Sequence, residues 1–388
     1  MRVPGFTSTG SKRPDALFGM GAPRGLPVRL ARAAGAEVWD AEGRRYLDFI
    51  MGLGAVSLGY AHPVVTAAAV DAIEAGVVGP LAPESEEQLA ERLAGMMPWM
   101  ERTRFLKTGA EAVAAAVRLA RAHTGRDFVL RCGYHGWLDW SQAPGTPGVP
   151  AAISGLSAEL PFGDAERGRS AIRAAGDRLA AIVVEPVIER APPAEWLLML
   201  REEATRAGAV LVFDEIKTGF RVAPGGAVER WSCVPDLVVF GKALANGFAL
   251  SAVGGRRDVM EQARRTWISS TLATELLGFA AAHATLDVLV RDEVPAFLRR
   301  AGERLVAGLA QLAAQHPALF LGVAGIPEMS YLRPVTEATG ARLARLAAER
   351  GLLWKRGAYN FVSLAHGEDQ VDRALAILAD CAATLERA

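Results

Sequence analysis

An acidic pair follows a strongly apolar run in the middle of the chain. The segment AVLVFD (209–214) ends in Asp214, and Glu215 and Ile216 come next. A carboxylate at a strand end can hold a cationic ring nitrogen, and Ile216 can press on the face of a flat ring. The pair could instead cap the following turn, where acidic residues are common. Asp214 is a candidate for binding a heterocycle, with capping as the alternative.

A lysine follows the next apolar run. DLVVF (236–240) leads into Gly241, Lys242 and a turn rich in glycine and asparagine. Lysine is rarely buried, so desolvation at the mouth of a strand should lower its pKa, as an imine-forming amine requires. A lysine in an exposed turn fits the pattern equally well. The two runs predict an acid and an amine at the tips of two strands.

A third segment, KTGAEA (107–112), could bind an anion. Thr108, Gly109 and Ala110 stand immediately before a helix that we expect to begin near Glu111. Free backbone N–H groups and the helix dipole at such a start suit a phosphate. A threonine followed by glycine before a helix is also an ordinary cap.

The fourth segment, GYHGWLDW (133–140), is an aromatic cluster bounded by glycines. It could stack on a planar cofactor and line a substrate pocket, although core packing would also explain the aromatic residues. We interpret His135 as a hydrogen-bonded structural residue, because no second ligand stands at metal spacing, and we predict no metal site. Trp137, Trp140 and the loop 354–360 would form a pocket for an apolar or ring-shaped acceptor.

The elements that must position these residues alternate between strand and helix. Continuous runs of valine, leucine and isoleucine predict strands covered by helices on both faces, hence an α/β fold with a mainly parallel sheet. Ligands of such sheets bind at the carboxyl ends of the strands. The predicted strands are 104–106, 127–131, 180–185, 209–214 and 236–240, and the predicted helices are 63–73, 84–93, 111–122, 164–175 and 195–207.

The two ends of the chain predict a smaller α+β lobe. AEVWD (36–40) and RRYLDFI (44–50) form a predicted hairpin, and the chain beyond about residue 290 is rich in helical patterns. Its predicted strands are 328–333, 352–355 and 360–364. We expect an N-terminal segment 1–60 that joins this lobe, a large ligand-binding domain 61–285 and a C-terminal domain 286–388.

Composition indicates an ordinary globular protein. Lys plus Arg and Asp plus Glu both number 43, so no net field favours nucleic acid or an anionic membrane, and a small neutral or zwitterionic ligand fits better. Cys132, Cys233 and Cys381 form no CxxC pair, so we expect a reducing, cytoplasmic location. We find no signal peptide, and polar residues interrupt the most apolar long segment, 271–290, so we expect a core helix there and no membrane partner.

Together the four segments resemble the class III (subgroup II) aminotransferases, most closely the branch around glutamate-1-semialdehyde aminomutase. EGRRYLDFIMGLGAVSLGYAHP (42–63) is similar to the family pattern DGxRYxDxxxxxGxxxxGHxHP, and RFLKTGAEAVAAAVRLARAHTGRD (104–127) to RFxNSGTEAxxxAxRLARxxTGRD. IVVEPV (182–187) and FDEIKTGFR (213–221) follow. The resemblance implies the fold type I architecture of enzymes that depend on pyridoxal 5'-phosphate (PLP).

Family membership would assign a role to each matching residue. Lys242 would form the internal aldimine and move the proton, and Asp214 would keep the pyridine nitrogen protonated. Thr271 would reach the phosphate of a neighbouring subunit, which implies a homodimer with shared active sites. Ile216 would pack on one face of the cofactor ring and Tyr134 on the other. The backbone amides of Gly109 and Ala110 would bind the phosphate.

The chain departs from the family pattern in several places. Thr108-Gly109-Ala110 lacks one hydroxyl of the usual phosphate turn, and Ala273-Thr274-Glu275 replaces the usual Gly-Asn-Pro after Thr271. The aminomutase has a glutamate in the C-terminal loop, where this chain carries Arg356, Tyr359 and Asn360, which argues against semialdehyde isomerisation. Arg356 could pair with a substrate carboxylate or be solvated, and Glu189 and Arg190 have no assigned role.

The leading hypothesis is an aminotransferase that moves an amino group from a small donor to a keto or aldehyde acceptor in ping-pong half-reactions. An aminomutase, a racemase or epimerase, or a decarboxylase on the same cofactor is the first alternative. A binding scaffold that has lost catalysis is the remote alternative.

Overall fold

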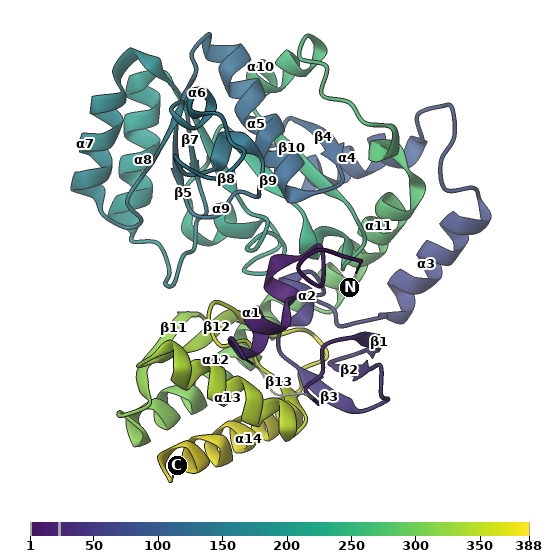
Figure 1. The fold of residues 1–388 in the computed structure, drawn as a ribbon. Coiled ribbons are helices and arrows are strands. Elements are labelled where there is room, and N and C mark those ends of the chain that lie inside the picture. The colour runs from purple at the N-terminus through teal and green to yellow at the C-terminus, as the bar shows by residue number, and fades with distance from the viewer. Residues whose placement is uncertain (1, 22–24, 388) are drawn as a thin grey trace. The chain divides into compact units, whose positions relative to one another are not determined.

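The computed structural model describes residues 2–21 and 25–387. Two compact units emerge from the contacts within the chain (Figure 1). We call Met1–Pro63 with Glu293–Ala388 the terminal unit, and Val64–Asp292 the central unit. The expected domain boundaries after residues 60 and 285 remain a prediction.

The central unit is built on a seven-stranded sheet in the order β4-β10-β9-β8-β7-β5-β6. Strands β9, β8, β7, β5 and β6 run parallel, whereas β10 is antiparallel to both of its neighbours. The mainly parallel sheet predicted from the sequence is therefore confirmed. The strands are β4 Arg102–Leu106, β5 Phe128–Cys132, β6 Ser157–Glu159, β7 Leu179–Val184, β8 Val210–Asp214, β9 Leu237–Phe240 and β10 Ser251–Gly255.

Burial explains why these sequences are continuously apolar. Successive strand side chains point to opposite faces, and both Val183 and Val184 are fully buried, so helices must cover both sides. Alanines and valines of α5 pack against alternate residues of the central strands, and α7 and α8 run side by side next to the sheet (Figure 1). The helices are α3 Pro63–Glu74, α4 Glu84–Met96, α5 Gly109–Thr124, α6 Ala151–Ser154, α7 Ala165–Ala175, α8 Ala194–Ala207, α9 Gly226–Trp231, α10 Arg257–Met260 and α11 Leu276–Arg291.

Strand β10 was not predicted because its sequence, SAVGG, resembles a loop. Glycine is required there by close packing. A Cβ on Gly254 would stand 2.2 Å from the Met100 Cε atom, and one on Gly255 would stand 2.1 Å from the Asp236 carbonyl oxygen. The short strands β1, β6 and β11 were missed as well.

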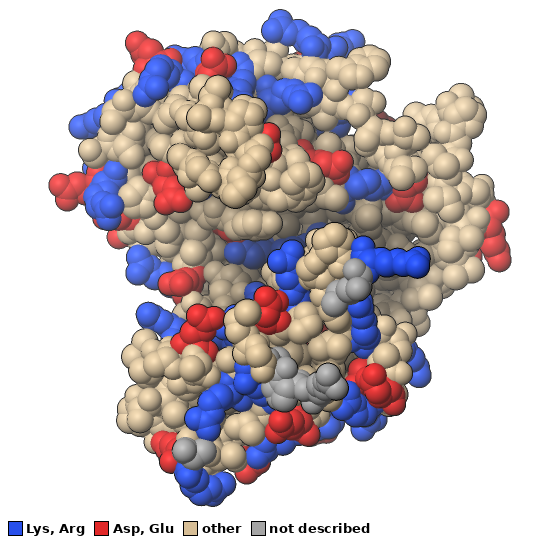
Figure 2. Space-filling view, in the orientation of Figure 1, with Lys and Arg blue, Asp and Glu red and all other residues tan. Residues whose placement is uncertain are grey.

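The core helix expected over 271–290 is present from Leu276 onward, after the short 3₁₀ turn η6 at Thr271–Thr274. Among the described residues, no helix combines the length and apolar character that crossing a membrane requires. Lys and Arg side chains are interspersed with Asp and Glu over the face drawn in Figure 2.

The terminal unit joins the two ends of the chain. Strand β13, Leu352–Leu353, pairs in parallel with β3, Arg45–Asp48, which confirms that N- and C-terminal segments share a sheet. The hairpin of β2, Glu37–Asp40, with β3 is also as predicted. The other elements are β1 Leu30–Ala34, β11 Phe320–Ile326, β12 Met329–Pro334, β14 Asn360–Phe361, α1 Pro14–Phe18, α2 Met51–Gly54, α12 Val294–Gln315, α13 Glu337–Glu349 and α14 Glu368–Glu386.

Candidate active site

A cavity of about 230 Å³ lies in the central unit where the predicted site residues meet. Its walls come from the carboxyl ends of β5, β7, β8 and β9 and from the start of α5, as expected for a parallel sheet. The lining residues are Thr108, Gly109, Ala110, Val113, Tyr134, His135, Gly136, Trp137, Glu185, Asp214, Ile216, Lys217 and Lys242.

Asp214 ends β8 with a buried carboxylate. Its Oδ2 atom lies 2.7 Å from Nδ1 of His135, and its Oδ1 accepts the Ile216 N–H at 3.2 Å. Because a carboxylate accepts, Nδ1 of His135 is the donor. The imidazole is buried and stacks on Trp140, with ring centroids 6.0 Å apart. His135 is thus the hydrogen-bonded residue we expected, but its partner is the proposed cofactor ligand, which only the fold could reveal.

The sequence allows two interpretations of the acidic pair Asp214 and Glu215, a ligand site or a cap, and the structure separates the two residues. Glu215 is fully buried and turned toward the start of α9, where it accepts the Ala227 N–H at 2.6 Å and the Thr218 hydroxyl at 2.9 Å. Burial raises the pKa of Glu215 to about 7. Glu215 therefore has the capping role, whereas Asp214 lines the cavity.

Lys242 follows β9 in a left-handed backbone conformation, with φ 44°, which is uncommon for a residue with a side chain. Burial, and after it the neighbouring Lys217 ammonium, lowers the pKa of Lys242 to about 8, although the Glu185 and Asp214 carboxylates act in the opposite direction. The prediction of a desolvated lysine at a strand mouth agrees with this environment. The amine is therefore partly neutral near physiological pH.

Glu185 and Lys217 are lining residues that the sequence did not single out. Glu185 follows β7, and its carboxylate forms an ion pair with Lys217 and accepts the Tyr134 N–H at 2.5 Å. Gly133 stands against this carboxylate with φ 107°, and a Cβ there would lie 2.6 Å from Glu185 Oε1. The contact fixes the backbone that presents Tyr134, whose side chain is 74% exposed. The position of Lys217, three residues after Asp214, was the available signal.

The start of α5 lies where the sequence predicts an anion cradle, and the binding of an anion there stays a prediction. The helix begins at Gly109, two residues earlier than expected, and Thr108 is its N-cap in a capping box with Glu111. Because its hydroxyl serves the cap, the groups left for an anion are the first helical amides, those of Gly109 and Ala110. A Cβ on Gly109 would stand 2.9 Å from Ile216 Cδ1, so a side chain at 109 would displace Ile216.

These residues fit a flat heterocycle with an anionic tail. One buried acid, one partly neutral amine, two helix-start amides and the side chain of Ile216 converge on one cavity. Thr271 is exposed in η6 and does not line this cavity, so its contact across a dimer stays a prediction. Among the described residues, no cluster of three or more His, Cys, Asp or Glu side chains could hold a metal ion.

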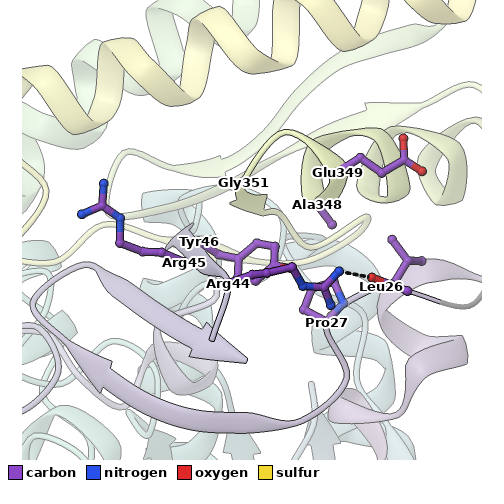
Figure 3. A pocket seen from close by; sticks show the side chains of 9 residues that line it. Leu26, Pro27, Arg44, Arg45, Tyr46, Ala348, Glu349 and Gly351 are labelled. Carbon is purple, nitrogen blue, oxygen red and sulfur yellow. Dashed lines mark hydrogen bonds between the residues drawn. The ribbon is translucent and has the colours of Figure 1, made fainter. Parts of the chain in front are cut away.

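Two other features of the terminal unit have structural explanations. Figure 3 shows a pocket of the terminal unit that Arg44 and Tyr46 help to line, and its volume is about 310 Å³. The Arg44 guanidinium is already bonded to the Gly25 carbonyl and to the Asp40 carboxylate. Arg356 is likewise engaged, by the Glu337 carboxylate and by the Ala16 carbonyl. Neither guanidinium needs a ligand to balance its charge.

Comparison with known proteins agrees with this site. The family model for aminotransferase class-III matches residues 21–381. The chain belongs to the class III aminotransferase family. It is 37% identical to glutamate-1-semialdehyde 2,1-aminomutase of Thermomicrobium roseum, over 90% of this chain and 89% of that protein. It is 36% identical to 2'-deamino-2'-hydroxyneamine transaminase of Streptomyces kanamyceticus, over 91% of each.

A solved structure extends the likeness to the fold. The PLP internal aldimine form of the FumI protein of Sphingopyxis sp. MTA144 superposes with a TM-score of 0.89 at 28% identity, over 96% of this chain and 94% of that one. The fold type I architecture is therefore confirmed, as is the predicted branch. Class III aminotransferases depend on PLP, so this aminotransferase is a PLP enzyme, and the acid, amine and amide cradle described above suit that cofactor.

Proposed function

We propose that this class III aminotransferase transfers an amino group from a small amino donor to a keto or aldehyde acceptor in two half-reactions, with Lys242 and Asp214 as its catalytic residues. The observation that carries the proposal is the convergence of both side chains on one cavity at the strand ends. The transaminase from Streptomyces kanamyceticus supports intermolecular transfer, because it matches over nearly the whole length of both chains.

Lys242 provides the amine that attaches the cofactor and then moves a proton at the substrate carbon. Bound PLP supplies an electron sink for the substrate carbanion. A pKa of about 8 lets the Lys242 amine accept a proton and return it near neutral pH, as general acid-base catalysis requires.

Asp214 would be the partner of the cofactor's pyridine nitrogen. Its buried carboxylate would hold a proton on the pyridine nitrogen, and the His135 hydrogen bond at 2.7 Å fixes its orientation. The Gly109 and Ala110 amides would bind the phosphate, while Ile216 would pack on one ring face and Tyr134 would cover the other.

The aminomutase is the second candidate function, because a protein of that name is 37% identical to this chain. A half-reaction experiment separates the two. Incubation of the purified enzyme with single amines should convert the absorbance of the lysine-bound cofactor to that of its amine form, with release of a keto product. Product formation while the lysine-bound absorbance persists would contradict intermolecular transfer.

The attachment point has its own test. Borohydride reduction of the holoenzyme, followed by peptide mapping, should leave the cofactor on the peptide that contains Lys242. The variant Lys242→Ala should yield no adduct, and Lys217→Ala should keep it, which controls for the second amine of the cavity. An adduct on Lys217 in the unaltered enzyme would refute the assignment.

We also propose a homodimer in the cytoplasm. Thr271 is exposed, and the nearby apolar side chains Trp267 and Leu272 are 87% and 55% exposed, as expected for a surface covered by a second copy. The three cysteines are buried free thiols, which suits a reducing compartment. Sedimentation should give a dimer, and Thr271→Ala should weaken PLP binding without altering that mass.

A further inference from the structure

A nearly buried ion pair lies beside the phosphate cradle. The Lys107 Nζ atom is 2.5 Å from Glu275 Oε1, and the two side chains are only 14% and 11% exposed. Lys107 is the residue between β4 and Thr108, the N-cap of α5. Glu275 follows η6 and is the N-cap of α11. The pair therefore joins the turn that presents the cradle amides to the start of a second helix.

Neighbouring groups contact both charges of the pair. Glu275 also accepts the Leu277 and Gly278 N–H groups at 2.7 and 3.0 Å, and the Lys107 Nζ atom lies 5.9 Å from the centre of the Phe279 ring. A Cβ on Gly278 would stand 3.0 Å from Glu275 Oε1 and 3.2 Å from Lys107 Nζ. Glycine at 278 therefore leaves the space in which the two charges meet.

Both members of the pair stand where the sequence departs from the family pattern. Lys107 occupies the asparagine position of RFxNSGTEA, and Glu275 ends the Ala-Thr-Glu segment that replaces Gly-Asn-Pro. The two departures lie 168 residues apart in sequence and meet in space. One contact therefore joins the two departures from the pattern.

We propose that Lys107 and Glu275 are positioning residues for phosphate binding, holding the turn before α5 so that the Gly109 and Ala110 amides point at the phosphate. The inference rests on the proposed function, because it takes these amides as the phosphate site. Ser251 tethers the same turn from outside the capping box, because its hydroxyl donates to the Thr108 carbonyl at 2.8 Å. Removing one member of a buried pair leaves the other charge uncompensated, so the turn must rearrange.

A purely stabilising ion pair would behave differently from a positioning pair. Loss of a stabilising pair lowers the unfolding temperature but weakens every ligand of the folded protein to the same extent. Loss of a positioning pair weakens ligands that carry the phosphate and spares those that lack it. The ratio of affinities for PLP and for pyridoxal, which has no phosphate, separates the two cases.

The experiment measures both affinities by titration of the apoenzyme for Lys107→Met, Glu275→Gln and the double variant, with the unfolding temperature of each. We expect each single change to weaken PLP binding by about tenfold and pyridoxal binding by less than about threefold. The double variant should lose about tenfold, not about a hundredfold, because both changes remove the same contact. Glu275→Gln keeps an acceptor for the α11 amides and carries the test if Lys107→Met fails to fold.

Asp287→Asn is the matched control. Asp287 also lies on α11 and pairs with Arg92 of α4 at 2.8 Å, but its side chain is 66% exposed. This variant should leave the ratio of affinities unchanged. Equal losses of PLP and pyridoxal binding in Glu275→Gln, or no loss of either, would overturn the inference. An unaltered enzyme without preference for PLP over pyridoxal would instead refute the phosphate site itself.

Discussion

Replacing Lys217 by methionine should raise the pKa of Lys242. The Lys217 ammonium is the largest electrostatic influence that lowers this pKa, after burial. Its removal leaves Glu185 and Asp214 facing the amine, and both of these carboxylates raise the pKa. The lowering effect of Lys217 exceeds the raising effect of Glu185, so the pKa should rise even if Glu185 turns away after it loses its ion pair with Lys217.

The magnitude follows from the starting pKa of about 8. At pH 7.5, roughly a quarter of Lys242 is neutral, compared with roughly 0.1% for a lysine with an ordinary pKa. An upward change of ~1 unit, which corresponds to ~1.4 kcal/mol, would reduce the neutral fraction about eightfold. Proton transfer by Lys242, and with it the rate of the half-reaction at pH 7.5, should fall by the same factor.

Competitive labelling of the apoenzyme gives the pKa directly. The rate of acetylation at Lys242, quantified by mass spectrometry across pH 6 to 11, should have its midpoint near 8 in the unaltered protein. The midpoint should move up in Lys217→Met and stay in place in Lys217→Arg, which keeps the charge. A midpoint that is unchanged or lower in Lys217→Met would refute the electrostatic role of Lys217.

Three further changes test other parts of the site. Lys242→Met should stabilise the apoprotein at pH 7 by up to ~3 kcal/mol, because it removes a buried charge. Between about pH 8 and 10.5 the amine of Lys242 is neutral in the folded protein but still protonated in the unfolded chain, so the gain should vanish as the pH rises through this range. Calorimetry at several pH values checks this. Glu215→Gln should lower the free energy of unfolding by ~1–3 kcal/mol, because it weakens the hydrogen bond from the Ala227 N–H, and it should leave PLP binding unchanged. Since the folded pKa of about 7 exceeds 4.5, the Glu215 contribution falls as pH rises from about 4.5 to 7, which denaturant titration should detect. Gly136→Ala should lower PLP affinity by at least about tenfold, because its Cβ would stand 2.4 Å from the Ala110 Cβ; absorbance titration measures this, and an unchanged affinity would contradict the packing.

The chemistry-bearing residues were predictable because they follow strong local patterns. The runs that end at Asp214 and just before Gly241 are continuously apolar, as buried strands of a parallel sheet are, and the carboxyl ends of such strands share one edge. Thr108 before a helix likewise predicts a helix start, where the first backbone amides have no partner within the helix. Periodicity and capping are properties of neighbouring residues, so one sequence is enough to reveal them.

Side-chain partners that lie far apart in the sequence could not be predicted from it. The pairing of His135 with Asp214, of Glu185 with Lys217, and of Lys107 with Glu275 joins residues 32 to 168 positions apart, and no local pattern relates them. Strand β10 was missed for a similar reason, since its glycines are required by Met100 and Asp236 elsewhere in the chain.

The sequence by itself determined the two strand tips, the helix start and the family to which they belong. Only the tertiary structure showed that Glu215 caps a helix and that His135 is the partner of Asp214, because these roles depend on which distant groups lie within hydrogen-bond distance of each carboxylate. Local patterns specify the type of backbone element, whereas the environment of a charge is set by whichever distant side chains the fold brings within a few ångströms.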